Sequence, residues 1–203
     1  AFASRGLVLS FFGKSSHASQ PENGHNPARA ISKLIIDIPE LTAREDHRGI
    51  VMATVVCVRI GEEAFGTNAG FGQLMLTIRA EFESELDALD AEICARARAY
   101  ARQDDITNVE VQYRDSFPET RNTPDAVAAV RKARLECELP EARWDEPFRS
   151  SEDFGCYTKL TSGALFYIGC GTRHAKLHTR EYDFNDEIIE PAVDMMFRLA
   201  QDA

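Results

Sequence analysis

The chain has 203 residues, of which 44% are hydrophobic and 28% charged, and its formal net charge is −10. This length predicts one or two domains, and the composition is typical of a soluble globular protein. Nucleic acids and anionic membranes attract positive surfaces, so the negative charge argues against both as partners. No apolar run in the sequence is long enough to span a membrane.

The cysteines indicate a reducing compartment. They are five, an odd number, and they are scattered without a CxxC pair: Cys57, Cys94, Cys137, Cys156 and Cys170. This usage is typical of free thiols in the cytoplasm. Residues 1–12 lack the basic start and the cleavage site of a signal peptide. Because the chain opens on Ala1 rather than Met, we expect a fragment or a processed product.

The first 115 residues predict six elements. Asn26 and Pro27 form a helix start, and Pro39 marks the expected helix end. The other segments follow from β-branched runs, alternation and helical spacing. In order, the elements are a strand at 7–12, a helix at 27–38, strands at 50–60 and 73–82, a helix at 86–100 and a strand at 107–114. The order β-α-β-β-α-β predicts an α+β, ferredoxin-like domain over residues 1–116.

The remaining residues, 117–203, predict an α/β segment that is incomplete as a domain. It contains a helix from 122 that Pro140 ends, a short capped helix at 150–154, a buried-type strand at 164–168 and a last helix at 186–200. A single clear strand cannot form a sheet of its own. We therefore expect further polypeptide beside this segment.

Two histidine-containing stretches are candidates for chemistry. His17 lies in a loop of small residues that lets a ligand approach the backbone closely. His174 and His178 are four residues apart, but their flanks predict a loop rather than a zinc-binding helix. One of them could ligate a metal ion, although a zinc site needs three or four ligands. Glu152 and Asp153 are explained by capping and by the helix dipole.

The loop and several later segments resemble one metallopeptidase family. Gly13-Lys-Ser-Ser-His17-Ala-Ser-Gln-Pro21, followed by Gly24-His-Asn-Pro27, resembles the G-x-x-x-H-A-x-x-P-x-x-G-x-[DN]-[PA] signature of dinuclear metallopeptidases. That family includes aminoacylases, carboxypeptidase G and amidohydrolases that cleave N-acyl amino acids. Further similar segments follow in the family's order: Asn68, Thr77-Ile-Arg79, Phe117-Pro118, Ser151-Glu-Asp-Phe154, Phe166-Tyr-Ile-Gly169 and Leu177-His178 with Tyr182-Asp-Phe184.

The resemblance implies a function for each segment. Residues 1–116 would be a lid and dimerisation domain, and residues 117–203 the C-terminal part of a catalytic domain. His17 would polarise the scissile carbonyl and stabilise the oxyanion, often in the partner subunit's active site. His178 would ligate a metal, while Asn68 and Glu152 would contact substrate. The complete protein would bind two divalent ions, zinc or manganese or cobalt, and cleave N-acyl amino acids or dipeptide-like substrates as a homodimer.

The resemblance also implies what this chain lacks. The family's N-terminal catalytic half, with most metal ligands and the general base, has no counterpart in the sequence, so the chain alone is expected to be inactive. Two other functions stay open. One is a non-catalytic dimerisation module. The other is a ferredoxin-like regulatory domain that binds a small ligand, although it leaves the order of motifs from Glu152 to Phe184 unexplained.

Overall fold

The computed structural model describes residues 1–142, 144, 146–172 and 174–201. The chain forms two packing units. Unit 1 comprises residues 1–119 and 147–153, and unit 2 comprises residues 120–146 and 154–203. These are units of packing, so the division into domains at residues 116 and 117 stays a prediction.

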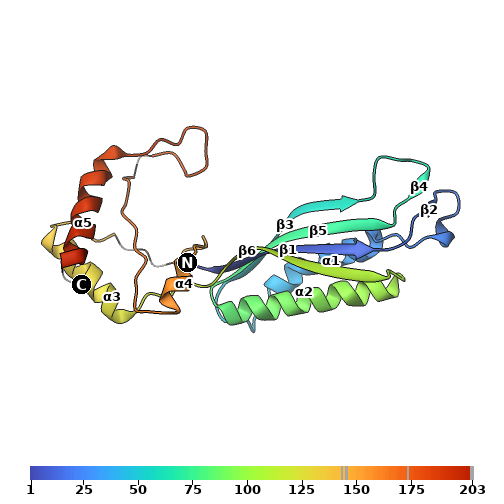
Figure 1. The fold of residues 1–203 in the computed structure, drawn as a ribbon, viewed down its shortest axis with the longest axis horizontal. Coiled ribbons are helices and arrows are strands. Elements are labelled where there is room, and N and C mark those ends of the chain that lie inside the picture. The colour runs from blue at the N-terminus through green and yellow to red at the C-terminus, as the bar shows by residue number, and fades with distance from the viewer. Residues whose placement is uncertain (143, 145, 173, 202–203) are drawn as a thin grey trace. The chain divides into compact units, whose positions relative to one another are not determined.

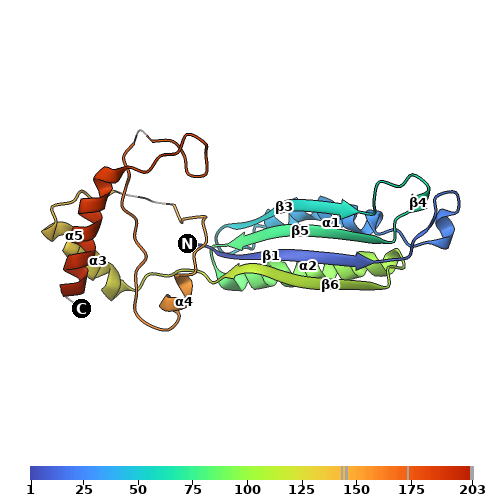
Figure 2. The same ribbon diagram turned by 45° about the horizontal axis from the view of Figure 1, so that its top comes forward.

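Unit 1 is a four-stranded antiparallel sheet with two helices on one face (Figures 1 and 2). The strands stand in the order β3-β5-β1-β6, which is the order of the split βαβ pattern and confirms the predicted α+β fold class. A separate two-stranded ribbon pairs β2 with β4. The elements are β1 (Ala3–Phe12), β2 (Ser16–His17), α1 (Ala28–Thr42), β3 (Val51–Ile60), β4 (Thr67–Asn68), β5 (Phe71–Ala80), α2 (Glu83–Gln103) and β6 (Asn108–Phe117).

The core of unit 1 lies between the sheet and the two helices. Alternate residues of each strand point to the same face, so one apolar set per strand meets the helices. Leu7, Leu9 and Phe11 of β1 belong to this set and are fully buried. The helices contribute apolar residues at helical spacing, principally Ala30, Ile31, Leu34, Ile38, Leu41, Leu86, Leu89, Ile93 and Ala97.

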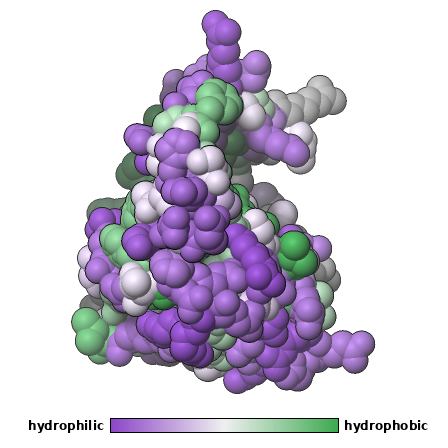
Figure 3. All heavy atoms as spheres, turned by 90° about the vertical axis from the view of Figure 1, so that its right-hand side faces the viewer, coloured by the Kyte–Doolittle hydropathy of each residue, from purple (hydrophilic) through white to green (hydrophobic). Residues whose placement is uncertain are grey.

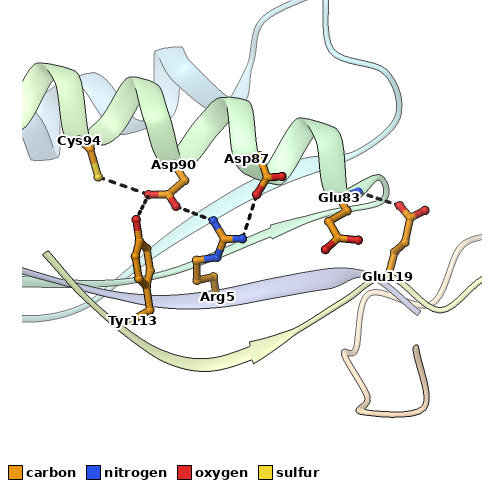
Figure 4. A network of polar contacts seen from close by, with 7 residues as sticks. All are labelled: Arg5, Glu83, Asp87, Asp90, Cys94, Tyr113 and Glu119. Atoms are coloured by element: carbon orange, nitrogen blue, oxygen red, sulfur yellow. Dashed lines mark hydrogen bonds and ion pairs between the residues drawn. The ribbon is translucent and has the colours of Figure 1, made fainter. Parts of the chain in front are cut away.

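A polar network fastens α2 onto the sheet (Figure 4). Arg5 of β1 donates to Asp90 and, at 2.9 Å, to Asp87. The Cys94 thiol and the Tyr113 hydroxyl donate to the same Asp90 carboxylate over 3.3 and 3.5 Å. Burial and the neighbouring Asp90 raise the pKa of the Cys94 thiol to about 12. Cys94 is therefore a protonated, unreactive part of this network at neutral pH.

The helix ends differ from the sequence predictions. Pro39 does not end α1, which continues to Thr42. Ile38 and Leu41 are both buried on the face that packs on the sheet, and this burial offsets the hydrogen bond that proline cannot donate. At the other helix start, Glu119 accepts the backbone N–H of Glu83 at 2.7 Å and so satisfies one free donor of α2.

Unit 2 has helices and long irregular segments. Its elements are α3 (Pro124–Glu136), α4 (Gly155–Thr158), a 3₁₀ helix (Asp186–Ile188) and α5 (Ile189–Gln201). The helix predicted to run to Pro140 ends at Glu136, and Glu138 adopts a positive φ of 54° that a helix cannot continue through.

Two further predictions for the C-terminal half were wrong. Residues 164–168 are not a strand, because a strand needs a paired neighbour and here the side chain of Asn122 bonds both the N–H and the C=O of Leu165. The short helix starts at Gly155 instead of Ser150. Its N-cap residue is Phe154, and the Ser151 hydroxyl accepts a hydrogen bond from Arg79 at 2.7 Å instead of capping the helix.

Candidate active-site hairpin

His17 belongs to β2, which pairs with β4 in a small two-stranded ribbon at one end of the sheet of unit 1 (Figure 1). The two strands are far apart in the sequence, and this ribbon of residues 16–17 and 67–68 is called the His17 hairpin. In this hairpin β2 pairs with β4, so that Ser16 is opposite Asn68 and His17 is opposite Thr67. The backbone N–H of Ala18 also donates to the Gly66 carbonyl at 2.9 Å. Seen from the hairpin end, the surface is mostly hydrophilic (Figure 3). The hairpin thus presents His17 on a polar, exposed surface.

Close backbone approaches hold the loop that leads to His17. Gly13 donates its N–H to the Gly70 carbonyl at 2.7 Å, and Lys14 and His25 exchange two backbone hydrogen bonds of 3.1 and 2.8 Å. A Cβ atom on Gly13 would come within 1.9 Å of the His25 carbonyl oxygen. One on Gly70 would come within 2.3 Å of the Ser15 nitrogen. Only glycine fits at either position, which accounts for Gly13, the first glycine of the motif.

The Asn68 amide ties three parts of this region together. Its nitrogen donates to Ser16 Oγ at 3.0 Å and to the Pro21 carbonyl at 3.4 Å, while its oxygen accepts from Asn26 Nδ2 at 2.8 Å. Asn26 Oδ1 in turn accepts the Ala28 N–H at the start of α1. Both ends of the Asn68 amide therefore have protein partners. Its predicted contact with substrate stays a prediction.

The partners of the His17 ring define its neutral tautomer. Nδ1 lies 3.1 Å from the backbone N–H of Ser19 and 2.7 Å from the Ser19 hydroxyl. A backbone N–H can only donate, so Nδ1 is the acceptor, and a neutral imidazole then carries its proton on Nε2. Among the residues that the structure describes, Nε2 has no partner. His17 therefore presents a free N–H donor at the end of the hairpin.

The other predicted site residues lie elsewhere. Glu152 is an exposed residue of the segment 147–153, which Arg79 and the N–H of Phe2 hold against the sheet of unit 1. His178 belongs to unit 2, where it is exposed in a turn and adopts a positive φ of 63°. His17 and His178 thus belong to different units. Their roles, and that of Glu152, stay predictions.

The described residues do not form a complete metal site. No group of three or more His, Cys, Asp or Glu side chains within the described ranges is placed to hold a metal ion. One close pair of possible ligands is Cys170 and His174, whose Sγ and Nε2 atoms lie 2.9 Å apart. A zinc ion takes four ligands, so these residues by themselves do not fit a bound metal.

Sequence reasoning missed the residues that support the hairpin. Ser16, Ser19 and Asn26 bond the side chains of Asn68 and His17. A local signal exists for Ser19 alone, since a serine two residues after a histidine can bond its ring within a turn. The Asn26–Asn68 contact joins residues 42 apart and leaves no local pattern in the sequence.

Comparison with known families gives the identity of this fold. A model of the peptidase dimerisation domain matches residues 2–105, just over half of the chain. The chain belongs to the M20 peptidase family. The match of this domain covers β1 to α2 and so includes the whole His17 hairpin. The predicted family resemblance is therefore confirmed.

Individual M20 relatives extend the similarity to almost the whole chain. Hippurate hydrolase of Campylobacter jejuni is 23% identical over 199 residues, which are 95% of this chain and 50% of that protein. N-acetyldiaminopimelate deacetylase of Bacillus licheniformis is 26% identical over 198 residues, which are 94% of this chain and 50% of that protein. The chain thus spans about half the length of the curated relatives that it matches.

Solved structures agree on the fold. The aminobenzoyl-glutamate utilization protein of Klebsiella pneumoniae superposes with a TM-score of 0.75 at 18% identity, over 99% of this chain and 48% of that one. Aminopeptidase PepT of Bacillus cereus gives a TM-score of 0.74 at 14% identity, over 98% of this chain and 51% of that one. Within the described residues, no helix is long and apolar enough to cross a membrane.

Proposed function

We propose that this chain is the lid and the C-terminal catalytic segment of a metal-dependent amidohydrolase that cleaves N-acyl amino acids or dipeptide-like amides in the cytoplasm. The family match supports a hydrolase, and two relatives are named for the hydrolysis of hippurate and of N-acetyldiaminopimelate. The free cysteines suit a reducing compartment.

The single observation that carries the proposal is the free Nε2–H donor of His17. Negative charge develops on the carbonyl oxygen when an amide is attacked, and a fixed donor aimed at this oxygen lowers the barrier. His17 lies on a paired strand whose flanking glycines and Asn68 hold its backbone in place. A donor held in this way needs little reorganisation during the reaction, which is the property that oxyanion stabilisation requires.

The proposal gives this chain only part of the catalytic centre. His178 supplies one metal ligand, Glu152 and Asn68 contact the substrate, and the remaining ligands of the two divalent ions come from polypeptide outside residues 1–203. The apolar groove of unit 2 supports a missing half. It has a volume of about 580 Å³ and is lined by residues of 164–168 and α5 such as Phe166, Ile189 and Val193. The rest of the catalytic domain would cover it.

The two edges of the sheet support a homodimer through β3. On β3, Val55, Val56 and Val58 are exposed, Val56 to 62%, and Ile36 of the adjacent helix α1 is 74% exposed. An exposed apolar edge strand is a template for pairing with another strand. The other edge strand is β6, in which the polar side chains of Glu110, Gln112 and Arg114 are exposed. Charged side chains along an edge discourage pairing, so a two-fold symmetric dimer would use β3.

The dimer is tested by light scattering of the 203-residue chain. We expect a mass of about twice 22.7 kDa for the wild type, and a monomer for Val56→Lys, because a lysine there places a charge at the centre of the paired edge. Gln112→Lys on β6 is the matched control and keeps the dimer. A wild-type monomer at every concentration would contradict the dimer.

The activity is tested on the longer protein that contains this chain. We expect hydrolysis of hippurate or of an N-acetyl amino acid after loading with zinc, manganese or cobalt, and loss of the activity on chelation. The 203-residue chain alone should hydrolyse none of these amides. If the metal-loaded longer protein forms dimers but cleaves no amide, the non-catalytic dimerisation module becomes the correct interpretation.

A further inference from the structure

The backbone around His17 places Ser19 against the histidine ring. The carbonyl of His17 accepts the N–H of Gln20 at 2.9 Å, which closes a β-turn over residues 17–20. The N–H of Ala18 inside this turn is held by Gly66 of the hairpin. Ser19 is the third residue of the turn, and its N–H faces Nδ1 of the His17 side chain.

Both donors of Ser19 meet the same ring nitrogen. The backbone N–H is 3.1 Å and the hydroxyl oxygen 2.7 Å from Nδ1, and both distances are within hydrogen-bonding range. The hydroxyl can rotate to donate, while the N–H has no alternative role. Together they satisfy the Nδ1 lone pair and disfavour a proton on Nδ1, which would point an N–H at another N–H.

We propose that Ser19 is a positioning residue that holds His17 in the tautomer with the proton on Nε2, aimed away from the turn as the donor for the substrate oxyanion. This inference rests on the proposed function for the role of the donor, but the tautomer itself is a property of this chain. With the proton on Nδ1, the ring would present a lone pair at Nε2 and would repel a developing oxyanion. Ser19 thus determines whether the His17 ring presents an N–H donor at Nε2.

His174 supplies an internal comparison. Its Nδ1 lies 2.8 Å from the carbonyl oxygen of Ala175, which can only accept. His174 therefore carries its proton on Nδ1, the opposite arrangement to His17. One protein thus contains both tautomers, and a single spectrum can report both.

The test is nitrogen NMR of the imidazole rings in the 203-residue chain at a pH where they are neutral. We expect a pyridine-type shift for Nδ1 and a pyrrole-type shift for Nε2 of His17, and the reverse for His174. In Ser19→Ala the two His17 shifts should move toward each other, because only the backbone donor remains. Ser19→Thr keeps the hydroxyl and should restore the wild-type shifts. Ser15→Ala, a serine of the same loop, is the matched control and should change nothing.

Kinetics of the same variants in the longer protein distinguish a positioning role of Ser19 from a purely structural one. We expect Ser19→Ala to lower kcat about two- to tenfold, the range for one lost hydrogen bond, with KM within twofold, and Ser19→Thr to recover it. A proton on Nδ1 of His17, averaged shifts in the wild type, or an unchanged spectrum in Ser19→Ala would overturn the proposal. If the tautomer is as expected but His17→Ala keeps full amidase activity, the proposed function fails and the tautomer assignment stands.

Discussion

The two packing units differ in how much of their apolar surface is buried. Unit 1 encloses a continuous core between the sheet and helices α1 and α2. In the described part of unit 2, the buried hydrophobic side chains are Ala133 and Met195, while α5 exposes a row of large ones: Ile189, Val193, Met196 and Phe197. A unit without a core of its own cannot offset its loss of conformational entropy. Unit 1 can therefore be stable alone, whereas unit 2 depends on further polypeptide that covers its exposed apolar face.

The largest effect should come from the core of unit 1. Leu34 of α1 is fully buried, and Leu34→Ala should lower the free energy of unfolding by about 2–5 kcal/mol, because it removes apolar contacts and leaves a cavity. Urea unfolding followed by circular dichroism measures this. Ser32→Ala, an exposed position of the same helix, is the control and should change stability by about 0.5 kcal/mol or less. Equal effects at both positions would contradict the assigned core.

The effect of a charged substitution on the exposed face of α5 should depend on whether further polypeptide covers this face. In the 203-residue chain, Val193→Asp should change stability by about 0.5 kcal/mol or less, since the side chain is already in water. In the longer protein the same change should cost about 2 kcal/mol or more, because it would bury a charge in the groove. Asp194→Asn on the same helix is the control. A large loss in the 203-residue chain would show that unit 2 already buries this face.

A change of pH should have a smaller effect on the stability of unit 1, through His47. Both nitrogens of His47 face acceptors, the Leu41 carbonyl at 2.8 Å and the Glu85 carboxylate at 2.9 Å, and its side chain is 11% exposed. The Leu41 carbonyl and the Glu85 carboxylate raise the pKa of His47 above its ordinary 6.5, although burial opposes them. The charges around it are Glu85, Glu92 and Asp46, together with Arg44, which is paired with Asp46.

The direction in which stability changes with pH follows from the raised pKa of His47. The folded state binds the proton more tightly than the unfolded state, so the stabilisation is complete below pH 6.5 and is lost as the pH rises through the folded-state value. We expect unit 1 to lose stability over this interval, because deprotonated His47 no longer donates to both the Leu41 carbonyl and the Glu85 carboxylate. His47→Gln should remove the pH dependence, and His25→Gln should keep it. A stability that rises with pH in this interval would contradict the geometry.

The regular part of unit 1 could be predicted from the sequence for a physical reason. Its four long strands and two helices each carry a local apolar period, which depends only on which face is buried. The hairpin of β2 and β4 was missed, because strands of two residues have no period. The strand predicted at 164–168 did not form, since a strand requires a distant partner that a local pattern cannot supply. Pro39 was misread for the related reason that tertiary burial outweighed a local rule.

The candidate site also has a part that the sequence predicts and a part that only the fold reveals. His17 could be singled out because its motif is contiguous along the chain. The Asn26–Asn68 bond and the packing of Gly70 against Ser15 depend on approaches between residues more than 40 positions apart, which only the fold reveals. These long-range contacts fix where the loop lies. The sequence therefore indicated the donor, and the structure adds the reason that it is held.

The activity of the His17→Ala variant in the metal-loaded longer protein tests the central claim most directly. Removal of one donor to an oxyanion lowers kcat by about 10²–10³, so we predict a loss of this size with a much smaller change in KM. His25→Ala, a histidine of the same loop whose contacts to Lys14 are through the backbone, is the matched control and should stay within about twofold. A His17→Ala enzyme with wild-type kcat would contradict the account.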